Sequence, residues 1–335
     1  MRITDPVLVP DVSLWCDHIN AKEFEDGGCQ SVVVGLYPVS VNGKWQLNPT
    51  CRNQCLEVAK TSMVLQAYYW DDIIIDPVRQ ANWVADTIQA EGLPVKFVWA
   101  DDEQWWTDWA KWANARAGKI PMASVPHATP GNIYFHMLSF VQTLRSRFPQ
   151  TGVYTNNGFV ASWAPDMNNF LPLYPAWVAE YAHEPKVITA MTWAQLKANW
   201  LPNYDIALAP GQIPSMVKGH QFTGDLIELP GAYDQYGREQ TLDVSVFSKA
   251  FIDGLRGGIP TPNQPPKPPI PAPQPLGTAY SVIYPRINVR AAPSGSAEWV
   301  RYAVLNEIVQ VVKIENGWAQ LTDGTFIFAD YIKKI

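Results

Sequence analysis

The chain has 335 residues, 47% hydrophobic and 17% charged, which is enough for one or two domains with cores of their own. Its 25 Lys and Arg against 31 Asp and Glu give a formal charge of −6, without the basic excess that nucleic-acid binding requires. The longest apolar runs, such as residues 31–39, are far shorter than the roughly 18 residues that span a bilayer. We therefore expect neither a nucleic-acid partner nor membrane insertion.

The N-terminal segment and the cysteines carry little further information. Asp5, Pro6 and Pro10 interrupt the stretch where a secretory signal would need about 7–15 apolar residues, so we expect that no export signal exists or that it has been removed. The four cysteines, which all lie in the first sixth of the chain, are Cys16, Cys29, Cys51 and Cys55. They are too few for a disulfide scaffold, and no histidine or second pair accompanies them at zinc-finger spacing. We expect structural or incidental thiols and no metal.

Residues 1–256 are predicted to alternate strands with helices. The predicted strands, all apolar, are Val7–Trp15, Ser31–Val39, Met63–Trp70, Val95–Asp101, Gly152–Asn156, Ala176–Tyr181, Asp205–Ala209 and Met216–Phe222. The clearest predicted helices are Pro77–Glu91, with Asp76 as its N-cap, and Gly131–Phe148. Eight apolar strands, several separated by helical patterns, favour an α/β fold of the TIM-like (β/α) barrel type over a doubly wound sheet.

The clearest domain boundary is the segment 257–277, in which nine of 21 residues are proline. Proline fixes the backbone angle φ, and the segment has few apolar side chains to bury, so we expect a semi-rigid polyproline linker. Residues 278–335 then form a second domain. Its predicted strands are Tyr280–Tyr284, Ile287–Arg290, Trp299–Val304, Ile308–Ile314, Trp318–Leu321 and Thr325–Phe328. They indicate a small all-β barrel, a kind of module that more often binds than catalyses.

Three consecutive acids end one of the predicted strands. The sequence Val95–Glu103, VKFVWADDE, places Asp101 and Glu103 on one side of an extended chain because side chains alternate along a strand. Their Cα atoms would lie about 6.6 Å apart, close enough for like-charge repulsion to raise one pKa and keep one acid protonated. Barrel active sites form at the carboxyl ends of strands. Asp11 has a similar place on the first strand, and Asp243 could close the same ring of acids.

Other interpretations of these acids stay open. They could cap a helix or lie in a solvated loop, and a site for a hard cation is a third interpretation, although no loop shows regular ligand spacing. The neighbouring tryptophans favour a sugar-binding cleft, because broad aromatic faces beside a few fixed polar groups suit sugars. These are Trp99, Trp105, Trp106, Trp109 and Trp112, which could equally be core residues.

Eight segments in order resemble glycoside hydrolase family 25, the Chalaropsis-type lysozymes found among phage endolysins and bacterial autolysins. They are DVSLW at Asp11–Trp15, QAYYW at Gln66–Trp70, DPVRQANWVADTI at Asp76–Ile88, ADDE at Ala100–Glu103, VYTN at Val153–Asn156, PAWVAEY at Pro175–Tyr181, HQFTGD at His220–Asp225 and LDVSVF at Leu242–Phe247. The tail resembles a bacterial SH3-type domain through INVRAAPS at Ile287–Ser294, NGWAQL at Asn316–Leu321 and the closing ADYIKKI. In this context such domains usually tether enzymes to the cell wall.

The resemblance implies a peptidoglycan hydrolase, an N-acetylmuramidase that cuts the β-1,4 bond between N-acetylmuramic acid and N-acetylglucosamine. Glu103 would be the general acid, Asp101 its partner at the developing positive charge, and Asp11 and Asp243 would tune charge and position sugar. Further cleft residues would be Tyr68, Tyr154, Trp177, Tyr181 and Gln221. Neither a cofactor nor a metal is implied, and peptidoglycan would be both the substrate and the wall anchor.

Two other functions remain open. One is a glycan-binding or structural cell-wall protein whose barrel has lost catalysis, which departures from the family pattern at Tyr69 and His220 motivate. The other keeps hydrolysis but acts on a different N-acetylated glycan. For its place of action we expect a phage-type lysin made in the host cytoplasm, or a secreted protein whose signal has been removed.

Overall fold

The computed structural model describes residues 1–335 except 183, 258–277, 285, 305–307, 322–323 and 335. The chain divides into two compact units, residues 1–259 and 260–335. The predicted linker at 257–277 lies outside the described residues apart from Gly257. Within the described ranges, every helix is too short or too polar to cross a lipid bilayer.

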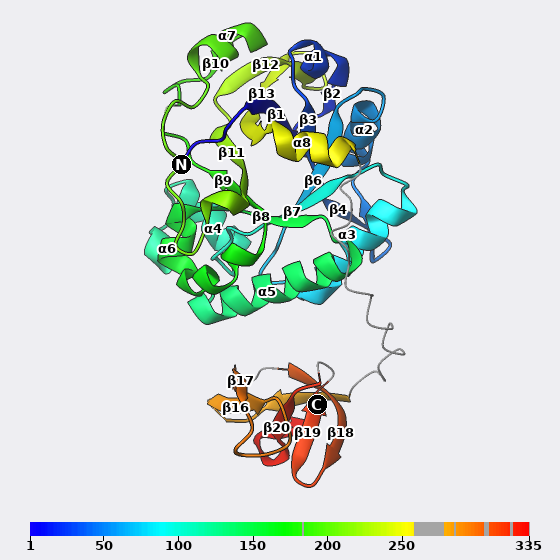
Figure 1. Cartoon of the computed structure of the whole chain (residues 1–335), viewed down its shortest axis with the longest axis vertical. Coiled ribbons are helices and arrows are strands. Elements are labelled where there is room, and N and C mark those ends of the chain that lie inside the picture. Colours follow the sequence, from blue (N-terminus) through cyan, green and yellow to red (C-terminus); the bar gives the residue numbers. More distant parts are fainter. Residues whose placement is uncertain (183, 258–277, 285, 305–307, 322–323, 335) are drawn as a thin grey trace. The chain divides into compact units, whose positions relative to one another are not determined.

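The first unit is built around a closed barrel of eight strands (Figure 1). Their order around the barrel is β1 (Pro6–Val12), β14 (Asp243–Ser248), β11 (Val217–Thr223), β9 (Ala176–Ala179), β8 (Thr151–Asn156), β7 (Phe97–Asp101), β6 (Val64–Trp70) and β3 (Ser31–Gly35). All neighbouring pairs are parallel except the two that β14 makes, with β1 and β11, which are antiparallel. The predicted α/β barrel is therefore confirmed, but one strand departs from the all-parallel TIM pattern.

One predicted strand was wrong. Residues 205–209 form no strand, and β14, which sequence analysis did not predict as a strand, closes the barrel instead. Pro202 and Pro210 flank the segment, and proline cannot donate to a strand ladder. The amide groups inside it find separate partners: Ile206 N donates to Met1 O at 2.6 Å, and Ala207 N donates to Glu180 Oε2 at 2.7 Å.

Helices surround the barrel and connect its strands (Figure 1). They are α1 (Ala21–Asp26), α2 (Pro49–Val58), α3 (Pro77–Ala90), α4 (Trp109–Arg116), α5 (Pro130–Arg147), α6 (Asn157–Trp163), α7 (Trp193–Asn199) and α8 (Lys249–Arg256), with short 3-10 turns η1 (Met122–Ser124), η2 (Pro165–Asn169), η3 (Leu171–Leu173) and η4 (Pro214–Met216). The predicted helices are α3 and α5. Asp76 caps α3 as expected, since its Oδ1 accepts from Arg79 N at 2.7 Å.

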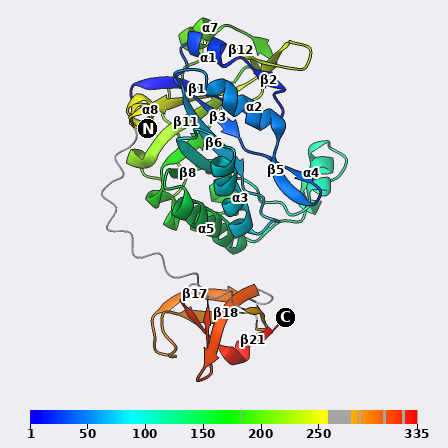
Figure 2. The ribbon, with the colours of Figure 1, turned by 90° about the vertical axis from the view of Figure 1, so that its right-hand side faces the viewer.

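Two small sheets extend the rim of the barrel (Figure 2). One joins β2 (His18–Ile19), β10 (Thr189–Ala190), β12 (Ile227–Tyr233) and β13 (Glu239–Thr241), and the segment with β12 and β13 leads from β11 into β14. The other is the hairpin of β4 (Pro38–Val41) and β5 (Lys44–Leu47), which follows β3.

Large aromatic side chains fill the barrel interior. Trp99, Trp177 and Phe247 are fully buried and contact one another, with ring centroids 5.7–5.9 Å apart. Glycines make room for them. A Cβ atom on Gly152 would come within 2.5 Å of the Trp99 ring, and one on Gly219 within 2.4 Å of Phe247. The interior is thus a packed core.

The second unit is all β in its described part. Its strands are β15 (Thr278–Val282), β16 (Arg286–Arg290), β17 (Trp299–Val304), β18 (Ile308–Glu315), β19 (Trp318–Leu321), β20 (Phe326–Phe328) and β21 (Ile332–Lys334), with the turn η5 (Ala329–Tyr331). They form one sheet in the order β17-β16-β20-β19-β18-β15-β21 around a separate core that includes Val289, Val311 and Ile327. The six predicted strands are present, and β21 adds an edge strand that sequence analysis did not predict.

Candidate active site

Three of the four predicted acids lie at the same rim of the barrel because of strand direction. Asp11 and Asp101 are at the carboxyl ends of the parallel strands β1 and β7. Asp243 is the first residue of β14, and because β14 runs antiparallel, its first residue lies opposite Asp11 in the register. Glu103 follows β7 by two residues. The predicted ring of acids therefore forms, with Asp243 brought to it by the strand that breaks the parallel pattern.

Gln221 on β11 holds the first pair of acids in place. Its Nε2 donates to both carboxylate oxygens of Asp11 at 3.1 Å and to Asp243 Oδ2 at 3.4 Å. Its Oε1 accepts from the hydroxyls of Tyr154, at 2.7 Å, and Tyr181. Gln221 is itself buried, and its hydrogen bonds hold the carboxyl groups of Asp11 and Asp243 in fixed positions.

Burial raises the pKa of both acids in this pair. The pKa of Asp11 rises to about 7, because burial outweighs the opposing hydrogen bond from Gln221, and the charge of Asp225 adds to the rise. The pKa of Asp243 lies well above its usual range, chiefly through burial and then through the charges of Asp11 and Asp225. The pair therefore holds protons more tightly than exposed carboxylates do.

The second pair is Asp101 and Glu103. Burial raises the pKa of Glu103 to about 7, against a hydrogen bond from Asn156 that lowers it. Burial is also the largest cause of the raised pKa of Asp101, followed by the charge of Glu103. We predicted repulsion between these two acids as the cause. Repulsion is present, but loss of solvent is the larger effect.

Asn156 is a site residue that sequence analysis missed in this role. It ends β8, next to β7, and its Nδ2 donates to Glu103 Oε2 at 3.3 Å. Its Oδ1 caps α6 by accepting from Phe159 N at 2.7 Å, and this fixes which way the amide faces. Its position at the end of a barrel strand was the available signal.

The predicted cleft residues fall into two groups. Tyr68 lines the cavity described below, and its hydroxyl lies 3.2 Å from that of Tyr37. Tyr181 is partly exposed, and Tyr154 is buried with its hydroxyl on Gln221. Trp177, in contrast, is only 2% exposed and belongs to the barrel interior, where its Nε1 donates to Ser245 Oγ at 2.9 Å. Its inward position on β9 thus places Trp177 beneath the site, and its contact with sugar stays a prediction.

A cavity of about 360 Å³ opens beside Asp11 and Asp243. Trp15, which is 78% exposed, and Asp225 contribute to its lining. Asp225 has a φ of 42°, in the left-handed region that side chains rarely adopt, and its N donates to Asp243 Oδ1 at 2.8 Å. The strained loop thus positions Asp243. No pattern in the sequence indicated this backbone contact.

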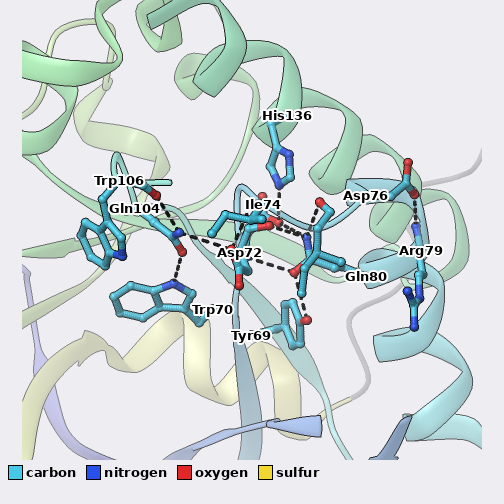
Figure 3. Close-up of polar contacts among 12 residues, drawn as sticks. Tyr69, Trp70, Asp72, Ile74, Asp76, Arg79, Gln80, Gln104, Trp106 and His136 are labelled. Carbon is cyan, nitrogen blue, oxygen red and sulfur yellow. Dashed lines mark hydrogen bonds and ion pairs between the residues drawn. The ribbon is translucent and has the colours of Figure 1, made fainter. Parts of the chain in front are cut away.

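A second polar network joins the loops that follow β6 and β7 to α3 and α5 (Figure 3). Gln80 Nε2 donates to Asp71 Oδ1 at 3.0 Å, and His136 Nε2 lies 2.8 Å from the same oxygen. Gln104 Nε2 donates to Asp72 Oδ1 at 3.2 Å, tying the loop after β7 to the loop after β6. Asp102 is buried, and within the described part of the chain its carboxylate oxygens have no partner.

Metal ligation has no support from the described residues, since no three Asp, Glu, His or Cys side chains among them are arranged to hold an ion. The four cysteines are buried and free of disulfides.

A sequence model of glycosyl hydrolases family 25 matches residues 10–224, which include Asp11, Asp101, Glu103 and Gln221. The chain belongs to glycosyl hydrolases family 25. This family 25 member is accordingly a glycoside hydrolase. The match ends before Asp243, the acid that the antiparallel strand supplies.

Solved structures to which this chain is similar include three hydrolases. The bacterial lysozyme from Streptomyces coelicolor is 14% identical over 76% of this chain and 98% of its own, with a TM-score of 0.50. A family 25 glycosyl hydrolase from Bacillus anthracis is 13% identical over 74% and 91%, with a TM-score of 0.48. A muramidase from Trichobolus zukalii is 13% identical over 75% and 99%, with a TM-score of 0.49. The first likeness supports the barrel fold. None of the curated proteins matches the family 25 chain in sequence.

Proposed function

We propose that this family 25 hydrolase is a peptidoglycan hydrolase of the N-acetylmuramidase type. It cleaves the β-1,4 bond between N-acetylmuramic acid and N-acetylglucosamine, with Glu103 as the general acid. The observation that carries the proposal is the pair Asp101 and Glu103 at the barrel rim, with a pKa of about 7 for Glu103. Two carboxyl groups at one glycosidic bond are what glycoside hydrolysis requires. The bacterial lysozyme and the muramidase among the similar structures are consistent with this substrate.

The proton is assigned to Glu103 for two reasons. Asn156 donates to Oε2, which leaves Oε1 to carry the proton toward the leaving oxygen of the sugar. A pKa of about 7 lets one group release a proton in bond cleavage and regain it from water in the second step.

Asp101 supports the developing positive charge at the anomeric carbon. It does so as a carboxylate once the growing positive charge at the anomeric carbon offsets its raised pKa, or by orienting the 2-acetamido group of the substrate, which then assists. Gln221 keeps Asp11 and Asp243 in fixed positions, from which they shape the local charge and bind sugar hydroxyls.

The decisive experiment compares wild type with Glu103→Gln on purified peptidoglycan and identifies the released fragments by mass spectrometry. Wild type is expected to release fragments with N-acetylmuramic acid at the reducing end. Glu103→Gln should retain the fold and lose at least about 99% of turnover, since the amide cannot donate the required proton. More than about a tenth of wild-type activity in the variant would overturn the assignment of Glu103.

The second unit is proposed as a bacterial SH3-type module that attaches the enzyme to the wall. Its small all-β architecture and its exposed aromatic side chains support this role. Trp299 is 51% exposed, and its ring lies 5.1 Å from that of Tyr302. Exposed aromatic surface of this kind suits a saccharide or peptide of the wall.

A further inference from the structure

A second cavity, larger than the one beside the acids, lies on the outer flank of the barrel. It has a volume of about 510 Å³ and is bounded by the hairpin β4–β5, the first half of α2 and the second half of α3. We call it the flank groove. The residues that matter for its chemistry are Trp45, Arg52, Asn53, Trp83, Asp86 and Glu91. Figure 2 shows β5 beside α3, which form one wall.

Its aromatic surface is fixed before any ligand arrives. Trp45 and Trp83 meet edge to face, with ring centroids 5.9 Å apart and an interplanar angle of 90°. The Arg79 guanidinium lies 4.1 Å from the centroid of the Trp45 ring and holds the indole from one side. Both indoles are half-buried, so each presents part of its surface to the groove. Preordered aromatic surface of this kind reduces the entropy cost of binding.

The charges of the groove are already neutralised. Arg52 Nε lies 2.7 Å from Glu91 Oε2, and Asp86 Oδ1 lies 2.6 Å from Arg147 Nη2. A polyanion or a strongly cationic peptide would have to break these pairs. The side-chain amides of Gln46 and Asn53 make no hydrogen bond within the described part of the chain, so they are open to a ligand. The groove therefore favours a neutral ligand with apolar faces and many hydroxyl or amide groups.

We propose that the flank groove is a second saccharide-binding site, which takes a neutral, N-acetylated stretch of glycan strand. Aromatic rings beside a few planar hydrogen-bonding groups match the alternating apolar and polar faces of such a sugar. The choice of ligand rests on the proposed function, because that function makes the polymer available to this surface. Binding at the groove would hold a strand on the barrel independently of the acids.

The test uses the full-length Glu103→Gln protein and the tetramer of N-acetylglucosamine as the probe. The indole N–H resonances of Trp45, Trp83 and Trp15 are followed by NMR, each assigned by its loss in the Trp→Phe variant. The indole resonances of Trp45 and Trp83 should shift as tetramer is added and should reach a plateau when the groove is saturated. Trp15 lines the cavity beside Asp11, so it reports on the acid site separately.

Asn53→Ala should raise the Kd for the tetramer, read from the Trp45 resonance, by about fivefold or more, as expected for loss of a central polar contact. The matched control is Gln89→Ala, an exposed residue of α3 outside the groove lining, which should behave like the parent. Three outcomes would each overturn the proposal. The tetramer could shift the indole resonance of Trp15 alone, or the Asn53→Ala variant could bind the tetramer as tightly as the parent. A stem peptide could also shift the Trp45 resonance when the tetramer does not.

The outcome is separable from that of the proposed function. Wild-type protein that releases no fragments from peptidoglycan, together with a saturable Trp45 response in the variant, would reject the muramidase and keep the groove. Efficient cleavage of peptidoglycan by wild type, together with a Trp45 resonance that does not shift in the variant, would reject only the proposed saccharide site in the flank groove.

Discussion

Asn156 helps to set how readily Glu103 releases its proton. Its amide donates to the carboxylate and so stabilises the charged form, which opposes the effect of burial on the pKa. If Glu103 is the general acid, as proposed, it must be protonated to act, so activity should fall as pH rises through its pKa, near 7. Above that pH, kcat/KM should decrease about tenfold per pH unit, which a pH profile on a soluble substrate measures.

Asn156→Ser tests the same contact directly. Serine still caps α6, but it is too short to reach Glu103, so the pKa of Glu103 should rise. The decline of kcat/KM at alkaline pH is expected to occur about half to one pH unit higher than in wild type, with little loss of stability. The control is Thr129→Ser at the cap of α5, which should leave the profile in place. A decline that stays at the same pH in Asn156→Ser would show that this hydrogen bond does not tune the acid.

Single residues of the site differ in how well sequence predicted them. Asp11, Asp101 and Glu103 were predictable because they stand at the ends of apolar strands. The burial of Trp177 was not predictable, because an inward side chain on a barrel strand can face either the cleft or the core. The contact of Asp225 N with Asp243 was not predictable, since any residue can supply a backbone amide once the loop adopts a left-handed turn.

Strand β7 ends in Asp101, and the next residue, Asp102, is buried with no hydrogen-bond partner for its carboxylate within the described part of the chain. Burial, with the charge of Asp71 adding to it, holds the pKa of Asp102 well above its usual range. The folded state therefore binds this proton more tightly than the unfolded chain. The free energy of unfolding should fall as pH rises from about 4 toward the folded pKa, because keeping the carboxyl protonated becomes costly.

Asp102→Asn removes that pH-dependent loss. The variant should be more stable than wild type at pH 8 by about 1–3 kcal/mol and should differ little at pH 4. Denaturant unfolding at the two pH values measures both. Asp166→Asn, at an exposed aspartate of η2, is the control and should have almost no effect at either pH. A variant that is less stable at pH 8 would mean that the carboxylate is charged and stabilising.

The aromatic interior of the barrel depends on small residues in its strands. Gly152→Ala should destabilise the protein by about 1–3 kcal/mol, since the new Cβ would meet both the Trp99 ring and the Pro175 carbonyl. Gly131→Ala in α5 is the matched control, because a Cβ there meets nothing within 4 Å. It should be neutral or stabilise by about 0.5–1 kcal/mol through helix propensity. Equal effects of the two variants in thermal unfolding would contradict this account of the core.

At the level of elements, periodicity identified the strands that helices separate. It failed at β14. This strand is preceded by β12 and β13 instead of by a helix, and it is antiparallel to both of its neighbours in the barrel. Residues 205–209 alternate like a strand, but their amides bond to Met1 and Glu180 in separate contacts, and a local pattern cannot reveal such distant partners.

The whole molecule combines a catalytic barrel with an all-β unit that has a core of its own. If that unit attaches the enzyme to the wall, a chain without residues 257–335 should pellet with purified walls several-fold less than the full chain. Cleavage of soluble fragments should be unchanged, since the acids all lie in residues 1–256. Co-sedimentation and a soluble-substrate assay measure the two effects. Unchanged pelleting would place wall attachment in the barrel.

The pairing of β1 with β14 also governs how the protein can be made. Residues 6–11 hydrogen-bond with residues 243–248, so the first strand emerges from the ribosome long before the strand that covers its edge. Until then both β1 and β11 present open edges to solvent, which are templates for association with other chains. A polypeptide cut short before residue 243 lacks Asp243 as well as the closing strand. Incomplete synthesis therefore yields an unclosed barrel without Asp243, and the closed barrel can form only once nearly all of its residues have been translated.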